Sequence, residues 1–530
     1  MLLDLQDIAQ NASHEADVCI IGAGVAGLTL ARALGRAGLD VCLLESGGMD
    51  HEAAINDLGV GANVGMPYYD LVDSRLRFFG GTTNIWGGRC VPLDALDFTP
   101  RAWVPHSGWP IDLEDLAAGY GRAAQALELG EPIDLESAWQ RMGSRPPEFE
   151  ALTTGFWYFD LVAERFSASR CRDLFQARNV RILTHATVTR IQATPGADGV
   201  TSIEFGGLDG KRATLKARAY ILAAGGIENA RLLLANCDVE SSGIGNRFDQ
   251  VGRYFMEHPH GRLGRIESDR VFEMWQWFAK RYPAGSVPLA PVLRPSARLQ
   301  ESAGILNTAL TFKLQRDPAL GVAADKRAYL SLKHQLSPTR TNRTLWHFYN
   351  RMRRFYQRHR TPLMRRRSRS EQRGLYAMIR AEQAPNPDSR ITLSNDRDAL
   401  GQPRAQLNWQ FTALDKHTLQ VLAQTLDEEL HAQRLGTFTA EPWVLESGTR
   451  WPVDPTVGNH PIAGYHHIGT TRMSSDPRRG VVDDNCRVFG YSNLYIAGSS
   501  VFTTAGWANP TMTILALGFR LADHLAEELC

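Results

Sequence analysis

The stretch from Asp17 to Glu45 constrains the fold more than any other part of the chain. An apolar run, VCII, leads into the turn Gly22-Ala-Gly24-Val-Ala-Gly27, then a helical stretch, LTLARALGRAG, and a second apolar run, VCLLE. A strand, a glycine turn, a helix and a second strand in this order form the βαβ unit of a dinucleotide-binding Rossmann half. The pattern therefore predicts an α/β fold with a parallel sheet.

The spacing of the glycines and of Glu45 predicts what this unit binds. The turn places a pyrophosphate at the N-terminus of the helix, and Glu45, 18 residues past Gly27, places a carboxylate on the ribose hydroxyls. No arginine stands near Glu45 to take a 2′-phosphate, which argues against NADP. FAD and NAD remain.

Two further glycine-turn segments extend the same domain. A β-rich stretch from about Val180 leads to ARAYILAAGGIENARLLLAN, and the chain ends with a strand, NLYIAGSS, a loop and a helix predicted from Met512 to about Glu528. A chain of 530 residues exceeds what one hydrophobic core usually supports, so we expect two interleaved domains. The predicted division is a dinucleotide-binding domain of residues 1–99, 178–260 and 455–530, and a substrate domain of residues 100–177 and 261–454.

A second glycine cluster, FGGTTNIWGGR, runs from Phe79 to Arg89. Its glycines let the backbone lie flat against a planar group and donate N–H groups to it. An isoalloxazine ring would suit such a surface. A purely structural loop is an equally good interpretation of this cluster alone.

Two C-terminal clusters carry groups suited to alcohol oxidation. One is YHHIGTTRM with His466 and His467, and the other is WANPT with Asn509 and Pro510, at the start of the last helix. Hydride abstraction from an alcohol needs a base for the hydroxyl proton and a polar group that orients the oxygen. The N-terminus of the last helix would stabilise a reduced flavin anion. An isolated histidine is otherwise more often a hydrogen-bonded core residue, and Trp507 can face a pyranose or simply pack.

Taken together, these motifs resemble the glucose-methanol-choline (GMC) family of FAD-dependent oxidoreductases over nearly the whole chain. The C-terminal block resembles the pyranose 2-oxidase and sugar-dehydrogenase branch more than it resembles choline dehydrogenase or aryl-alcohol oxidase. The matching pieces are GAGVAG with Glu45, FGGTTNIWGG, ILAAGGIENARLLL, VGRYFMEHP, NPDSRITLS with DALGQPRAQLNW, HHIGTTRM, and GVVDDNCRVFGYSNLYIAGSSVFTTAGWANPTMTILALGFRLADHL.

The resemblance implies an α/β fold, in which an FAD-binding Rossmann-type domain (GMC, p-hydroxybenzoate-hydroxylase-like) is interleaved with a β-sheet-based substrate domain. It implies oxidation of the CH–OH group of a sugar, glycoside or polyol by hydride transfer to flavin N5, with oxygen or another acceptor taking the electrons. His466 would be the base and Asn509 would orient the alcohol oxygen. The implied cofactor-binding residues are Gly22, Gly24, Gly27, Glu45, Gly80, Gly81, Thr82, Asn84, Val188, Ser499, Asn509, Pro510 and Thr511.

Departures from the family pattern add expectations. Some sugar oxidases tether FAD through a histidine where this chain has Ile85, so we expect non-covalent FAD. Many members carry an acid where this chain has Gly498 and Ser499, so backbone N–H groups would contact the flavin there. A donor site for NAD(P)H would need a second GxGxxG motif, which ILAAGGIENA does not supply. The rival function is a flavin-binding subunit of a membrane-associated or multi-protein dehydrogenase complex, which the presence of His466 and Asn509 disfavours.

Composition limits the partners and the compartment. With 58 Lys and Arg against 57 Asp and Glu, the chain has no global field for nucleic acid, and no nucleic-acid partner is expected. The seven cysteines show no metal-ligand spacing, so neither a metal site nor a disulfide framework is expected. The first residues lack the basic and apolar regions of a signal peptide, and no apolar run is long enough to span a bilayer. We therefore expect a cytoplasmic protein.

One segment departs from the average composition. Between Arg351 and Arg373 the chain has ten arginines and a single acid, Glu371. A solvated surface segment is the simpler interpretation. The alternative is peripheral attachment to an anionic membrane surface or to an acidic partner.

Overall fold

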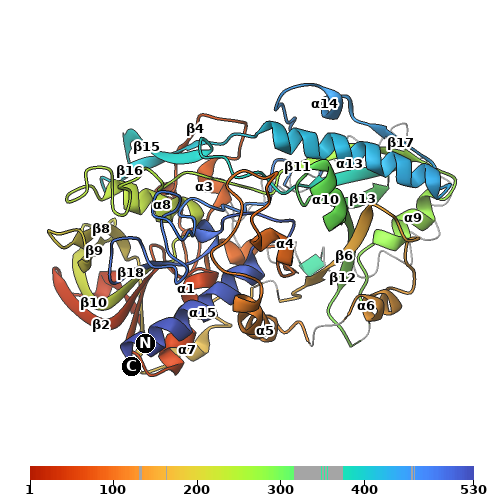
Figure 1. Cartoon of the computed structure of the whole chain (residues 1–530). Helices are drawn as coiled ribbons and strands as arrows, with labels where there is room; N and C mark the ends of the chain where they lie inside the picture. The colour runs from red at the N-terminus through yellow and green to blue at the C-terminus, as the bar shows by residue number, and fades with distance from the viewer. Residues whose placement is uncertain are drawn as a thin grey trace.

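The computed structural model describes most of the chain (Figure 1). The described residues are 1–130, 134–162, 164–283, 285–314, 374–454, 457–458 and 460–530, together with Phe348, Arg351, Met352 and Phe355. The predicted attachment segment, residues 351–373, lies outside the described residues apart from Arg351, Met352 and Phe355. No helix within the described ranges combines the length and the apolar character that crossing a membrane requires.

An eight-stranded sheet contains the predicted βαβ unit, which is formed by β2 (Ala12–Ile21), α1 (Val25–Arg36) and β3 (Val41–Leu44). Strands β1, β7, β3, β2, β10 and β18 pair in parallel, whereas β8 and β9 add an antiparallel edge beside β10. The remaining bounds are β1 (Leu2–Asp4), β7 (Val180–Thr184), β8 (Thr187–Ala193), β9 (Val200–Gly206), β10 (Arg212–Leu222) and β18 (Leu494–Ile496).

The apolar runs of this sheet are buried because helices cover its strands. Val18, Ile20, Val41 and Leu43 are each 0% exposed. Helix α15 (Thr511–Leu529) packs against α1 and against α5 (Ala117–Ala126), and Figure 1 shows α15 running beside α1. Since β2, β3 and β10 are parallel, the loops that follow them meet at one edge of the sheet. That edge is where the predicted dinucleotide site belongs.

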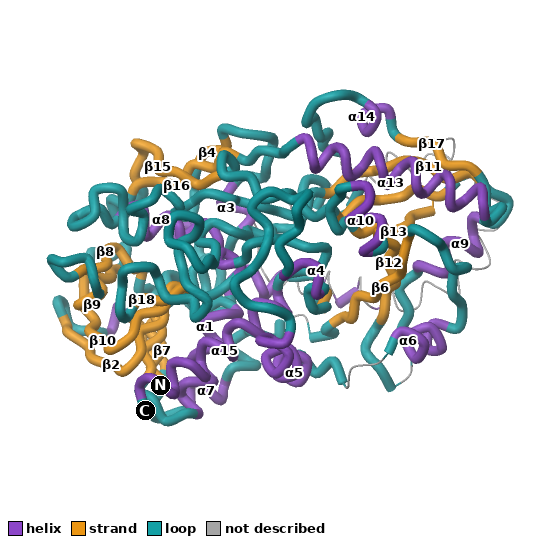
Figure 2. The backbone as a smooth tube through the Cα atoms, viewed as in Figure 1, coloured by secondary structure: helices purple, strands orange, loops and turns teal. Residues whose placement is uncertain are grey.

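A seven-stranded antiparallel sheet forms the other half of the molecule (Figure 2). Helix α13 (Ala413–Ala432) contacts β17 and β11 of this sheet and begins with a capping box between Thr412 and Asp415. The strands in order are β17 (Thr437–Ala440), β11 (His260–Glu267), β14 (Leu375–Arg380), β13 (Ala309–Leu314), β12 (Leu289–Pro295), β6 (Leu152–Phe159) and β5 (Arg89–Cys90).

A third, three-stranded sheet lies against helix α8 (Gly226–Ala235) and consists of β15 (Arg390–Arg397), β16 (Pro403–Asn408) and β4 (Ala62–Asn63). The other described elements are short. They are η1 (Leu5–Asp7), α2 (Ala53–Asp57), α3 (Leu71–Ser74), η2 (Gly81–Ile85), α4 (Ala95–Phe98), η3 (Glu114–Leu116), α6 (Leu135–Met142), α7 (Arg172–Gln176), α9 (Val271–Phe278), α10 (Ala297–Ala303), α14 (Pro442–Leu445) and η5 (Ser499–Val501).

The division into two domains stays a prediction. Two groups of strands contact elements outside the predicted domain in which their residues lie. Strand β5, which falls within the predicted segment 1–99, pairs with β6 of the seven-stranded sheet. Strands β15 and β16, which fall within the predicted segment 261–454, pack on α8 beside the eight-stranded sheet. Both groups of strands therefore contact elements that the predicted division assigns to the other domain.

A buried ion pair links distant parts of the chain. The Arg101 guanidinium donates to Glu382 at 2.9 Å, and both side chains are 0% exposed. Glu382 also accepts the backbone N–H groups of Asn307 at 2.7 Å and of Gly506 at 3.3 Å. One carboxylate thus holds the loop that leads to Asn509 against the antiparallel sheet.

Candidate active site

A cavity opens at the edge where β2, β3 and β10 end. Its lining comes from the first glycine turn, the end of β3, the second glycine cluster, the start of β8, the turn after β10 and the loop after β18. Representative lining residues are Gly22, Gly24, Glu45, Gly81, Thr82, Val188, Gly225, Ser499 and Ile514. The crevice at the carboxyl ends of parallel strands is where open α/β sheets bind ligands.

The first glycine turn needs its glycines for two different reasons. A Cβ on Gly27 would stand 1.9 Å from the Gly22 carbonyl oxygen, so Gly27 permits the close packing of α1 on the turn. A Cβ on Gly24 would meet no protein atom within 4 Å. Gly24 lines the cavity, and its missing side chain leaves open space for a ligand to approach the backbone.

Glu45 holds this turn in shape. Its carboxylate accepts the backbone N–H of Ala23 at 2.8 Å and that of Gly47 at 3.0 Å. Burial raises the pKa of Glu45, although the two N–H donors and Arg77 oppose that shift. Each oxygen keeps a second lone pair that a ribose hydroxyl can use.

The second glycine cluster packs directly on the first turn. Gly80 donates its N–H to the Ala23 carbonyl at 2.8 Å, and Gly80 and Gly81 have φ angles of +87° and +52°, which side chains rarely adopt. Asn84 is 0% exposed and donates from Nδ2 to the Phe79 carbonyl at 2.8 Å. Its Oδ1 has no hydrogen-bond partner among the described residues. Asn84 therefore supports the loop and also leaves a buried acceptor.

Arginines that the sequence reasoning missed lie on the same cavity. Arg75 and Arg77 precede the second glycine cluster and pair with Glu228 at 3.1 and 2.6 Å. All three line the cavity. Despite burial, the cations Arg77, Arg75 and Arg231 hold the pKa of Glu228 well below its usual range. The two arginines of the run RLRF, before the glycines, were the only local signal for this cluster. A run of this kind does not show where its side chains point in the folded chain.

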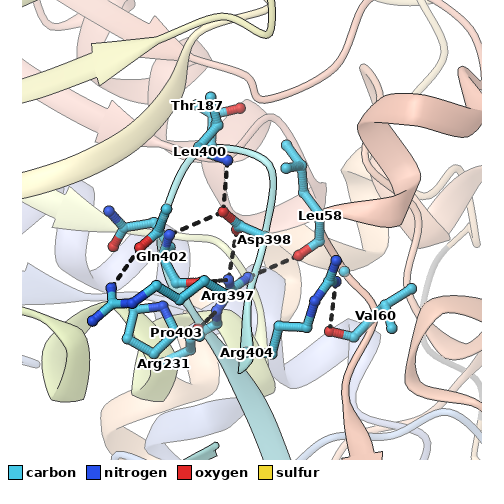
Figure 3. A network of polar contacts seen from close by, with 12 residues as sticks. Leu58, Val60, Thr187, Arg231, Arg397, Asp398, Leu400, Gln402, Pro403 and Arg404 are labelled. Atoms are coloured by element: carbon cyan, nitrogen blue, oxygen red, sulfur yellow. Dashed lines mark hydrogen bonds and ion pairs between the residues drawn. The ribbon is translucent and has the colours of Figure 1, made fainter. Parts of the chain in front are cut away.

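Figure 3 shows how the β15–β16 turn joins this cluster. Arg231 donates to Asp398 at 2.6 Å and to the carbonyls of Pro403 at 2.7 Å and Leu58 at 2.9 Å. Asp398 accepts the backbone N–H groups of Leu400 and Gln402 at 2.9 and 3.0 Å. Asp398 and Gln402 line the cavity, so a segment predicted for the substrate domain closes part of it.

These residues fit a dinucleotide. The Nε and Nη1 atoms of buried Arg75 have no hydrogen-bond partner among the described residues, and a buried cation with free donors calls for an anionic group. Gly225 resembles Gly24 in that an added Cβ there would meet nothing within 4 Å. An open glycine cradle beside an incompletely satisfied arginine suits a pyrophosphate at the start of α1.

His466 and Asn509 lie together, although 43 residues separate them. Asn509 immediately precedes the N-cap of α15, Pro510, and its Nδ2 stands 3.2 Å from His466 Nε2. His466 belongs to the loop before the isolated bridge between Met256 and Ile468. The predicted catalytic pair is thus within hydrogen-bonding distance.

His258, which the sequence reasoning did not single out, contacts the other side of His466. The Nδ1 atoms of the two rings are 2.7 Å apart. His258 is 3% exposed, and its Nε2 lies 2.9 Å from the Gly506 carbonyl oxygen and 3.3 Å from that of Ala505. It lies within VGRYFMEHP, but the 208 residues between it and His466 hide the contact from any local pattern.

The environment keeps both rings neutral. Burial is the largest cause that lowers the pKa of His466 well below its usual value, followed by His258 and Arg89. Burial also lowers the pKa of His258. A neutral imidazole at position 466 is what a general base requires.

The neighbouring residues have supporting contacts. His467 lines the dinucleotide cavity, its Nε2 lies 3.1 Å from the Tyr68 hydroxyl, and Ser499 donates to its carbonyl at 2.7 Å. Trp507 is 3% exposed and donates to Asp94 at 3.0 Å. This burial favours the packing interpretation of Trp507 over a face for a sugar ring.

The predicted cofactor-binding residues divide into three groups by position. Gly22, Gly24, Glu45, Gly81, Thr82, Val188 and Ser499 line the cavity. Gly27, Gly80 and Asn84 support the two glycine turns from behind, while Asn509, Pro510 and Thr511 lie at the start of α15. Their individual roles toward a ligand stay predictions.

Two parts of the chain match known protein families. Residues 17–242 match the family model of FAD dependent oxidoreductases, and residues 385–518 match that of GMC oxidoreductases. The fructose dehydrogenase large subunit of Gluconobacter japonicus is 25% identical over 66% of this chain, and the chain spans about half, 54%, of that relative's length. The 6'''-hydroxyparomomycin C oxidase of Streptomyces lividus is 24% identical over 97% of this chain and 92% of its own.

A solved structure shows the same fold. A formate oxidase variant from Aspergillus oryzae RIB40 superposes with a TM-score of 0.51 at 18% identity, covering 98% of this chain and 99% of that one. The predicted α/β FAD-binding fold is therefore confirmed. The matched families bind FAD, which confirms the prediction of FAD as the cofactor. Residues 17–242 therefore carry an FAD dependent oxidoreductase domain, and residues 385–518 carry a GMC oxidoreductase domain.

Proposed function

We propose that the protein oxidises a CH–OH group of a sugar, glycoside or polyol to the aldehyde or ketone. The single observation that carries the proposal is the His466–Asn509 pair, because its 3.2 Å contact joins a neutral imidazole nitrogen and an amide at the start of α15. Bound FAD would supply the acceptor for the carbinol hydrogen and its electron pair.

The chain's own residues divide the remaining work. His466 accepts the hydroxyl proton at Nε2, and Asn509 Nδ2 orients the alcohol oxygen beside it. Arg75 and Arg77 hold the pyrophosphate side of the cofactor, and Glu45 holds the ribose. Ile85 cannot form a covalent tether to a flavin, so binding is non-covalent at this position.

The names of the relatives support the substrate class. The two relatives described above act, by their names, on fructose and on 6'''-hydroxyparomomycin C. We infer a polyhydroxylated substrate for this chain. Oxygen or another acceptor would then remove the electrons from the reduced cofactor. The cytoplasmic localisation stays a prediction. Contact of residues 351–373 with a membrane or an acidic partner also stays a prediction.

The test begins with the visible spectrum of the purified protein before and after acid precipitation. We expect a yellow supernatant, since non-covalent FAD is released when the protein precipitates. The holoenzyme is then mixed anaerobically with D-fructose, D-glucose, methyl glucoside or glycerol. Bleaching by at least one of these probes supports the proposal, and a holoenzyme that none of them bleaches contradicts the substrate class.

His466→Ala tests the role of the base. The side chain of His466 does not line the FAD cavity, so the variant should keep its flavin and lose about 10²- to 10⁴-fold in the anaerobic bleaching rate. A variant that bleaches as fast as the wild type would remove His466 from the mechanism. His467→Ala differs, because that residue lines the cavity and its loss should weaken flavin binding.

A further inference from the structure

Three side chains and a backbone carbonyl form a continuous line of hydrogen bonds through the active site. The Gly506 carbonyl lies 2.9 Å from His258 Nε2, and His258 Nδ1 lies 2.7 Å from His466 Nδ1. At the far end, His466 Nε2 lies 3.2 Å from Asn509 Nδ2. All four groups belong to the described chain, and no ligand is needed to complete the line.

The chemistry of the end groups sets the direction of each bond. A carbonyl oxygen only accepts, so His258 carries its proton on Nε2 and donates it to Gly506. A neutral imidazole has one N–H, so His258 Nδ1 is an acceptor, and the bond at 2.7 Å requires a proton on His466 Nδ1. His466 Nε2 is left with its lone pair exposed toward Asn509, whose Nδ2 can only donate.

We propose that His258 is a positioning residue that fixes His466 in the neutral tautomer protonated on Nδ1. The inference rests on the proposed function for its consequence, because only the lone pair on Nε2 can take the hydroxyl proton. The tautomer of a histidine is set by the hydrogen bond that its other nitrogen makes.

The hydrogen bonds on the His258 side of His466 do not change during the reaction. The hydroxyl O–H bond breaks and an Nε2–H bond forms on His466, and FAD, when bound, would supply the acceptor for the carbinol hydrogen and its electron pair. The Nδ1–H of the resulting imidazolium still donates to His258 Nδ1. His258 keeps its own proton on Nε2 throughout, so the two bonds on the His258 side are conserved, and Asn509 Nδ2 exchanges its bond to His466 Nε2 for one to the substrate oxygen.

The same ring also sets the distance between the catalytic pair. His258 binds His466 on one side and, through Gly506, the loop that carries Asn509 on the other. The preceding residue, Glu257, is 0% exposed and accepts the N–H groups of His258 at 3.0 Å and Gly464 at 3.3 Å. Two consecutive residues thus hold both catalytic loops.

The tautomer can be read without substrate. Long-range ¹H–¹⁵N correlations of ¹⁵N-histidine-labelled holoenzyme distinguish the two neutral tautomers, and the His466 signals are assigned by their disappearance in His466→Asn. We expect the pattern of a ring protonated on Nδ1. A wild-type His466 protonated on Nε2 would overturn the proposal whatever the variants do.

Variants at His258 separate the hydrogen bond from general packing. His258→Leu removes the acceptor, and we expect His466 to change to the Nε2-protonated tautomer. His258→Asn keeps an acceptor oxygen near the Nδ1 position and should retain the wild-type tautomer. The matched control is His260→Leu, because His260 is also buried, at 6% exposure, on the same segment but bonds to the His460 carbonyl at 2.6 Å.

The anaerobic bleaching rates of these variants then distinguish the positioning role of His258 from the proposed role of His466 as base. We expect His258→Leu to lose about 10²- to 10⁴-fold in anaerobic bleaching by the probe that bleaches the wild type, and His258→Asn to lose less than about 10-fold. An unchanged tautomer in His258→Leu contradicts the positioning role. A changed tautomer with an unchanged bleaching rate leaves that role intact and contradicts the proposed function of His466 instead.

Discussion

Gly24→Ala should weaken FAD binding while leaving the apoprotein folded. Gly24 has φ −79° and ψ −172°, angles that alanine adopts without strain, and the added Cβ meets no protein atom within 4 Å. The methyl group would instead occupy the space through which a phosphate oxygen reaches the backbone N–H groups of the turn.

The magnitude follows from the hydrogen bonds that would lengthen. A hydrogen bond to a charged group contributes about 1.5–3 kcal/mol, so the loss of one such bond weakens binding by roughly 10- to 100-fold. The assay is a titration of apoprotein with FAD, followed by the quenching of flavin fluorescence. The apoprotein's urea midpoint should change little, since an N-cap replacement of Gly by Ala costs about 1 kcal/mol or less.

Two controls sharpen the result. Gly121→Ala, on the exposed side of α5, also places a Cβ where no protein atom lies within 4 Å, but it does not line the cavity and should bind FAD normally. Gly27→Ala places its Cβ 1.9 Å from the Gly22 carbonyl oxygen and should destabilise the apoprotein itself. Wild-type affinity in Gly24→Ala would refute the assignment of the cradle.

Two other predictions concern titration and stability. Because burial lowers the pKa of His466 well below the ordinary value of 6.5, the base is neutral at and above pH 6.5. The anaerobic bleaching rate should therefore be constant above pH 6.5 and fall only at lower pH. A rate that already falls with decreasing pH above pH 7 would contradict this. Arg101→Met leaves Glu382 buried without its cation and should cost about 3–5 kcal/mol, seen as a lower urea midpoint. Arg101→Met combined with Glu382→Gln should recover part of that loss, and no recovery would show that the charge is not the cause.

The apolar runs and glycine turns of the sequence predicted the secondary-structure elements whose residues are neighbours in the chain. The βαβ unit and the last helix appear where the sequence placed them, with α15 at Thr511–Leu529 against the predicted Met512 to about Glu528. Strand β2 begins at Ala12, before the apolar run, because Ala12 pairs with Ala213 of β10. That extension depends on a partner 200 residues away, which no window of sequence contains.

The candidate site was predictable only in part. Gly24 and Glu45 belong to one motif, and their spacing alone indicates a dinucleotide. Arg231 and Asp398 meet across 167 residues, and the role inferred for His258 depends on the carbonyl of Gly506. Such contacts are set by the direction of side chains in the folded chain, so the sequence reasoning named His466 and Asn509 but not the residue that holds them.

The order of the chain also determines when the cofactor can bind during synthesis. The cavity is opened by Gly24 and closed by Ile514 of α15, which packs against α1. About 490 residues separate these two positions, so at about 5–20 residues per second a ribosome needs roughly 25–100 s to make both. During that interval the nascent Rossmann half has no helix α15 over α1 and no finished cavity. We therefore expect the complete flavin cavity to form only after translation of the last helix.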